Sequence, residues 1–125
     1  MIDSHCHLAD KQFDAELDAV LQRAKLAGVS HMVTIADTFA EAEKCIVIAE
    51  RYAHVFATVG VHPHEAHSWK RGDSDRLRDL FLSSKKVKAI GEIGLDYHYD
   101  HSPRSDQRAV FLEQLSLATD LHVPV

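Results

Sequence analysis

The sequence predicts an α/β fold in which parallel strands alternate with helices. Short apolar stretches rich in β-branched residues recur along the chain, and each is followed by a stretch whose apolar residues recur at helical spacing. This order repeats four times before a last apolar stretch begins a fifth strand. Strands that alternate with helices pair in parallel through right-handed crossovers, so we expect one parallel sheet buried against a helical layer.

The first two strand–helix units have clear boundaries. Residues 2–8 and 31–36 are predicted strands. Gly28 ends the first helix as a C-cap, and Thr38 begins the second as the first residue of a capping box, from which the helix runs to about Tyr52. The residues expected to face the core are Phe13, Leu17, Val20, Leu21 and Ala24 in the first helix, and Phe39, Ala42, Ile46 and Ala49 in the second.

The next two units follow the same order. Residues 55–61 and 87–95 are predicted strands, and residues 123–125 begin the fifth. One helix begins at Asp73 or Ser74, and another begins between residues 102 and 105. The inward-facing residues of these helices are Leu77, Leu80 and Phe81 in the former, and Phe111, Leu115 and Ala118 in the latter.

The composition indicates one soluble, folded domain, which we place at residues 1–125. With 46% hydrophobic and 26% charged residues, the chain is not expected to be disordered. No stretch approaches the roughly 18 apolar residues of a membrane span, and we find no signal peptide, so no membrane partner is expected. Two cysteines, Cys6 and Cys45, do not make a disulfide framework, so we expect a reducing, cytoplasmic location.

The charge balance excludes the class of proteins that bind nucleic acid through phosphate contacts alone. The net charge is −5, from 14 Lys and Arg against 19 Asp and Glu. A nucleic-acid substrate would need a metal ion or a local basic patch to receive its phosphates. The compositional oddity is the ten histidines, of which His5, His7, His62, His64 and His67 fall in two short windows.

The first histidine window lies on the first predicted strand. Side chains alternate along a strand, so Asp3, His5 and His7 share one face. Two imidazoles two residues apart can converge on one divalent cation and supply half of a four-ligand site. The alternative is a pair of ordinary surface histidines, because His-x-His also occurs by chance.

Two further clusters follow later strands. His62 and His64 share a face after the third strand. The sequence leaves two alternatives open: the pair contacts metal or substrate, or it is a histidine-rich loop with no role. Glu92 and Asp96 share a face of the fourth. A carboxylate in an apolar strand is costly to bury unless it is paired, so a metal held by histidines would compensate Glu92, with a structural ion pair as the alternative. Parallel α/β folds bind ligands at the C-terminal ends of their strands, where these clusters fall.

Three motifs together resemble the TatD family of metal-dependent deoxyribonucleases. The resemblance covers essentially all 125 residues and matches the N-terminal half of the family. It implies parallel (β/α) units of a TIM-type barrel, about the first half of a (β/α)8 barrel, with a divalent-metal centre at the C-terminal ends of the strands. The motifs are Asp3-Ser4-His5-Cys6-His7-Leu8, Gly60-Val61-His62-Pro63-His64 and Gly91-Glu92-Ile93-Gly94-Leu95-Asp96-Tyr97.

The resemblance also implies the roles of the site residues. His5 and His7 bind one metal ion, and Glu92 binds it too, bridges to a second ion and takes part in catalysis. The implied cofactors are one or two divalent ions, with zinc, magnesium, manganese and nickel all compatible. The remaining ligands, two histidines and an aspartate, belong to strands five, six and eight. The residues expected near the substrate are His62, His64 and Asp96.

The activity that the resemblance implies is hydrolysis of phosphodiester bonds in DNA. One alternative is a metal-dependent esterase or deacylase built on the same barrel. Another is an inactive half-barrel fragment that retains metal affinity. Because four strands and part of a fifth cannot close a barrel, we also expect the isolated chain to associate with copies of itself.

Overall fold

The computed structural model describes residues 1–125 and contains one parallel sheet with the strand order β1-β2-β3-β4. Each strand is followed by a helix, as the sequence predicts. The strands are β1 (Ile2–Cys6), β2 (His31–Thr34), β3 (Val55–Val59) and β4 (Val87–Ile90). The helices are α1 (Leu17–Leu26), α2 (Phe39–Arg51), α3 (Asp73–Ser83) and α4 (Arg104–Leu121), with two short 3₁₀ helices, η1 (Lys11–Phe13) and η2 (Pro63–Ser68).

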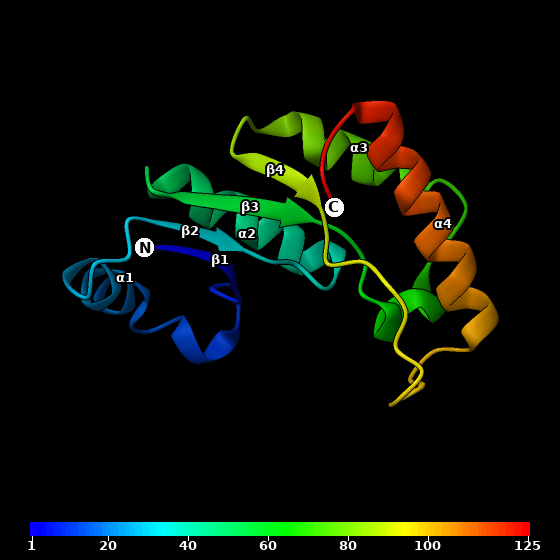
Figure 1. The fold of residues 1–125 in the computed structure, drawn as a ribbon, viewed down its shortest axis with the longest axis horizontal. Coiled ribbons are helices and arrows are strands. Elements are labelled where there is room, and N and C mark those ends of the chain that lie inside the picture. Colours follow the sequence, from blue (N-terminus) through cyan, green and yellow to red (C-terminus); the bar gives the residue numbers. More distant parts are fainter.

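The helices lie on one side of the sheet and enclose the core. In Figure 1, α2 lies behind the sheet, α1 lies near its β1 edge and α4 lies near its β4 edge. Side chains such as Met32, Val55 and Val59 project from the strands into this layer and meet Leu77 and Leu117 of the helices. None of the helices combines the length and the apolar composition that a membrane span requires.

The other side of the sheet is not covered by a helical layer. A hollow of about 520 Å³ lies there, lined by Val33, Ile35, Thr58 and Ala89 and by charged groups that include Lys88. In a closed barrel this side would be the interior.

Every strand that leads to the site is shorter than the sequence predicts. β1 ends before His7, β3 ends at Val59 and β4 ends at Ile90, so residues 91–95 are not part of the sheet. Beyond β3 the chain passes close to the residue that follows β4. A Cβ atom on Gly60 would lie 2.6 Å from the carbonyl carbon of Gly91, so only glycine fits at position 60.

The helix boundaries match better than the helix faces. Thr38 caps α2 as expected and accepts the N–H of Glu41 at 3.2 Å. The first helix begins later than the sequence predicts, because Phe13 belongs to η1 and α1 begins at Leu17. The buried stripe of α2 is Ala42, Cys45, Ile48 and Ala49, and that of α4 is Gln107, Val110, Gln114, Leu117 and Ala118.

The expected fifth strand is not formed as a regular element. Residues 123–125 have no strand assignment. The N–H of Ile90 nevertheless donates to the carbonyl oxygen of Pro124 at 3.1 Å, so the last residues lie beside β4, where a fifth strand would pair (Figure 1).

Candidate functional site

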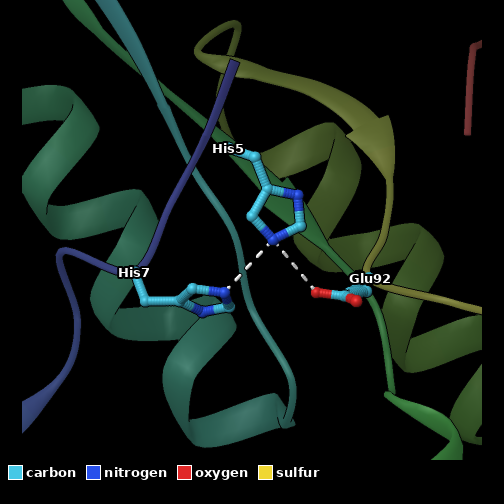
Figure 2. A group of neighbouring side chains, drawn as sticks. All are labelled: His5, His7 and Glu92. Carbon is cyan, nitrogen blue, oxygen red and sulfur yellow. Dashed lines mark hydrogen bonds and ion pairs between the residues drawn. The ribbon is translucent and has the colours of Figure 1, made fainter. Parts of the chain in front are cut away.

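His5, His7 and Glu92 converge at the C-terminal ends of the strands. The Nε2 atoms of His5 and His7 lie 3.2 Å apart, and Nε2 of His5 lies 3.3 Å from Oε2 of Glu92. Figure 2 shows the His5 ring between the other two side chains. One ligand atom from each residue lies within 4.8 Å of the other two, and such a group could hold a metal ion. The expected convergence of the two histidines is therefore found, with Glu92 beside them.

The convergence joins residues from the two edges of the sheet. β1 and β4 are the two edge strands, and in a flat sheet with a strand spacing of about 4.8 Å they would lie about 14 Å apart. Here His5 and Glu92 are in contact. After β4 the chain turns inward across the strand ends, where the N–H of Glu92 donates to the carbonyl oxygen of Ala36 at 2.9 Å.

The position of Glu92 corrects the expectation that its carboxylate is buried within an apolar strand. Glu92 follows β4, and 33% of its side chain is exposed. One carboxylate oxygen faces His5, and the other lies 3.7 Å from Nε2 of His62. The carboxylate therefore has imidazole nitrogens on two sides and is not isolated in the core.

His64 belongs to a second pair beside this cluster. Its Nε2 lies 2.5 Å from Oδ2 of Asp96, and its ring packs edge-on against His62 with centroids 4.3 Å apart. The sequence predicts that Asp96 shares a strand face with Glu92. In the structure Asp96 instead turns toward His64. Hydrogen bonds from the N–H of Tyr99, from His64 and from the N–H of His98 lower the pKa of Asp96 to about 2, so it is ionised at neutral pH.

Two buried glutamines of α4 hold the loops that carry these side chains. Gln114 accepts the N–H of Val61 at 2.8 Å and donates to its carbonyl oxygen at 3.0 Å. Gln107 does the same for Asp96, at 2.8 and 3.1 Å. Each amide thus fixes a backbone segment next to a histidine or carboxylate of the site.

Sequence reasoning missed both glutamines. The spacing predicts an apolar stripe through Phe111, Leu115 and Ala118, of which Ala118 lies on the buried face while Phe111 and Leu115 are only partly buried. The available signal is the spacing of Gln107, Val110, Gln114 and Leu117, which repeats every three or four residues and includes two amides in an otherwise apolar face.

The cysteine between the two metal-type histidines takes no part in the cluster. Sγ of Cys6 donates to the carbonyl oxygen of Val33 at 3.3 Å. Burial, followed by the charge of Asp3, raises the pKa of this thiol to about 12. A protonated thiol is a poor metal ligand, so Cys6 is a core residue, as predicted.

A groove adjoins the cluster on its His62 side. It has a volume of about 430 Å³ and is lined by His62, Pro63 and residues 92–98. Glu92 and Asp96 both belong to this lining, so the groove reaches the centre at Glu92.

Comparisons with known proteins show which proteins this chain resembles. The family model described as TatD related DNase matches residues 2–125. The chain is 40% identical over 125 residues to the 3'-5' ssDNA/RNA exonuclease TatD of Cronobacter sakazakii, covering all of this chain and 47% of that protein. It is 34% identical to the uncharacterized metal-dependent hydrolase YabD of Bacillus subtilis, covering all of this chain and 49% of that protein.

A solved structure shows the same arrangement of elements. The TatD homologue YjjV from Escherichia coli K12 superimposes with a TM-score of 0.92 at 32% identity, covering all of this chain and 49% of that one. The chain thus spans about half the length of the curated relatives and of the solved structure that it matches. The expected architecture, the first half of a TatD-type barrel, is confirmed by this superposition.

Proposed function

Because this chain belongs to the family of TatD-related DNases, we propose that it forms part of a divalent-metal-dependent hydrolase that cleaves phosphodiester bonds in nucleic acid, with DNA as the expected substrate. The convergence of His5, His7 and Glu92 at the strand ends carries this proposal. The names of two relatives, an ssDNA/RNA exonuclease and a metal-dependent hydrolase, support it.

The donor set fits a divalent ion. Imidazole nitrogens and carboxylate oxygens bind such ions at 2.0–2.2 Å, so two donors of one ion lie at most about 4.4 Å apart. The separations of 3.2 Å between His5 and His7 and of 3.3 Å between His5 and Glu92 are inside this limit. The imidazoles are neutral donors, and Glu92 adds the negative charge that offsets the ion. Zinc, manganese, nickel and iron suit this set, and magnesium suits it with more water.

The chain's own residues have separate roles in the proposed reaction. A divalent ion held by His5, His7 and Glu92 would supply Lewis acidity toward a phosphoryl oxygen and would lower the pKa of water at the site. Glu92 is the catalytic carboxylate, placed so that its two oxygens face different neighbours. An ion held by His5, His7 and Glu92 would also offer positive charge to a phosphate that the net charge of −5 would otherwise repel.

His62 and His64 are proposed to contact the substrate. His62 faces the groove beside Glu92, and His64 is oriented by its contact with Asp96. Both oxygens of Asp96 are already engaged by His64 and by backbone N–H groups, so Asp96 acts as a positioning residue. This refines its expected contact with substrate.

The domain and its location complete the proposal. We assign residues 1–125 to the N-terminal half of a TatD-type barrel domain. Cys6 and Cys45 are both free thiols, and a cytoplasmic location would keep them reduced.

The activity is tested on the natural gene product, depleted of metal and reloaded with zinc, manganese or magnesium. We expect hydrolysis of single-stranded DNA or RNA that a chelator abolishes and a divalent ion restores. Small carboxylic esters serve as the comparison substrate. Cleavage of esters alone would replace the nuclease by an esterase, and activity that survives full metal depletion would refute the metal-dependent mechanism.

Histidine variants separate substrate contact from metal binding. His62→Ala or His64→Ala should lower turnover on DNA while the bound metal, measured by elemental analysis, stays nearly unchanged. The reason is that neither residue belongs to the His5, His7 and Glu92 cluster. Loss of stoichiometric metal in either variant would instead make that histidine a metal ligand.

A further inference from the structure

The segment after Asp96 is held firmly by hydrogen bonds. Oδ1 of Asp96 accepts the N–H groups of His98 and Tyr99 at 2.9 and 3.1 Å. The buried amide of Gln107 bonds both the N–H and the carbonyl oxygen of Asp96. The backbone of this segment is therefore fixed, although it belongs to no helix or strand.

This fixed segment presents aromatic rings to the solvent. Tyr99 is 64% exposed, and its ring centroid lies 5.7 Å from that of His101. Both rings also contact His64, at 5.9 and 4.3 Å. Tyr97 differs, because the guanidinium of Arg104 lies 4.6 Å from its centroid. We call Tyr99 and His101 the aromatic face.

The carboxylates next to the aromatic face are paired. Asp96 contacts His64, and Asp100 accepts hydrogen bonds from Arg104 through both of its oxygens. A polyanion that approaches the face therefore does not meet an unpaired negative charge from either aspartate.

The aromatic face is continuous with the candidate metal centre. His64, which touches both rings of the face, packs on His62, whose Nε2 lies 3.7 Å from Glu92. The groove beside Glu92 is lined by residues 92–98, the segment that leads directly into the face.

We propose that the aromatic face is a base-stacking site, at which Tyr99 and His101 hold an unpaired nucleobase of the strand whose phosphodiester lies at His5, His7 and Glu92. This inference rests on the proposed nuclease function. A fixed, exposed ring presents a flat apolar surface at little cost in conformational entropy, and every base can stack on it. The site selects single strands, because a paired base within a duplex is already stacked on its neighbours.

The test measures binding rather than hydrolysis. The natural gene product with its metal is titrated into fluorescein-labelled phosphorothioate oligothymidine, which resists cleavage, and into an abasic strand of the same length. Fluorescence anisotropy reports Kd. We expect Tyr99→Leu to weaken binding of oligothymidine by about 5- to 150-fold and to change binding of the abasic strand little. Tyr99→Phe retains the ring and should bind oligothymidine as the wild type does.

Leu82→Ala is the matched control. Leu82 is also 64% exposed, but it lies near the end of α3, just before β4 begins and so at the opposite end of the strands from the site. This variant should bind both strands normally. The stacking site is refuted if wild type binds the two strands equally, or if Tyr99→Leu weakens binding of both by the same factor. Failure of the nuclease proposal is a separate result, seen as absence of hydrolysis of an unmodified strand by the metal-loaded wild type.

Discussion

Glu92 is the acidic side chain on which the proposed metal centre depends. It contacts His5 on one side and lies close to His62 on the other, and a third of its side chain is exposed. Its charge, rather than its packing, is therefore its main contribution. The charge and the shape of this residue can be separated by experiment.

We expect Glu92→Gln to abolish hydrolysis in the natural gene product and to weaken metal binding by more than about 10-fold. The amide keeps the shape but removes the negative charge that offsets the cation. Calorimetric titration with zinc or manganese measures the affinity, and thermal unfolding of the metal-free protein should be nearly unchanged. Glu43→Gln, in an exposed ion pair with Arg76, is the control. Wild-type turnover in Glu92→Gln would refute the catalytic role.

Asp96 offers a prediction on pH dependence. Its pKa falls from 3.8 to about 2 on folding, because the N–H of Tyr99, the side chain of His64 and the N–H of His98 bond the ionised form. A lowered pKa stabilises the folded state above pH 3.8, and this contribution is lost as the pH falls from 3.8 toward 2. Urea unfolding should show wild type more stable than Asp96→Asn near neutral pH, with the difference shrinking across that window. A difference that stays constant would show that ionisation of Asp96 is not its source.

At the scale of elements, α4 connects the core to the site. Its buried face carries two amides two turns apart, and each bonds both backbone groups of one loop residue, Val61 or Asp96. An apolar side chain of similar size would leave these groups unpaired.

We expect Gln114→Leu to lower the free energy of unfolding by about 2–6 kcal/mol, since two buried backbone groups lose their partners at about 1–3 kcal/mol each. Turnover should fall by more than the loss of folded protein accounts for. The reason is that Gln114 holds Val61, and Val61 directly precedes His62. Gln22→Leu, at an exposed position of α1, is the control and should change stability by no more than about 0.5 kcal/mol. Urea unfolding and kcat, compared at equal folded fractions, provide the test; equal effects of the two substitutions would refute the role of Gln114.

The elements also show what could be predicted from sequence. Helix starts such as Thr38 and Asp73 follow local capping and periodicity, which the sequence displays directly. The ends of the strands do not follow such local signals. Residues 91–95 alternate like a strand, and Gly91 indicates that another backbone can come close, but its partner Gly60 is 31 residues away, so the sequence does not show which segment it meets. The histidine clusters were found because parallel strands bring their C-terminal ends to one edge, a rule that needs no side-chain detail.

The whole molecule has one sheet face that is open to solvent. Val33, Ile35 and Ala89 line its hollow, and β1 is an edge strand without a neighbour on its outer side. The other edge is partly occupied, because Ile90 bonds Pro124. An apolar face beside a free strand edge favours pairing with another chain.

We therefore expect a preparation of residues 1–125 to associate at micromolar concentration, as measured by light scattering. Ile2→Lys should reduce this association, because it places a charge on the free edge strand, where Ile2 is 63% exposed. Val47→Lys, on α2 at 67% exposure, adds the same charge elsewhere and should leave association unchanged. A monomer that unfolds cooperatively at that concentration would refute the expectation.

The contact between His5 and Glu92 has a further consequence. The two residues are 87 positions apart in the chain, from 5 to 92, and they come from β1 and from the segment after β4, at the two edges of the four-stranded sheet. A cation held by both would act as a cross-link between the first strand and the segment after the last. Such a link restricts the unfolded chain as a disulfide does, so occupancy and folding become thermodynamically coupled. Loss of the ion under metal starvation would then lower the stability of the fold as well as remove the activity.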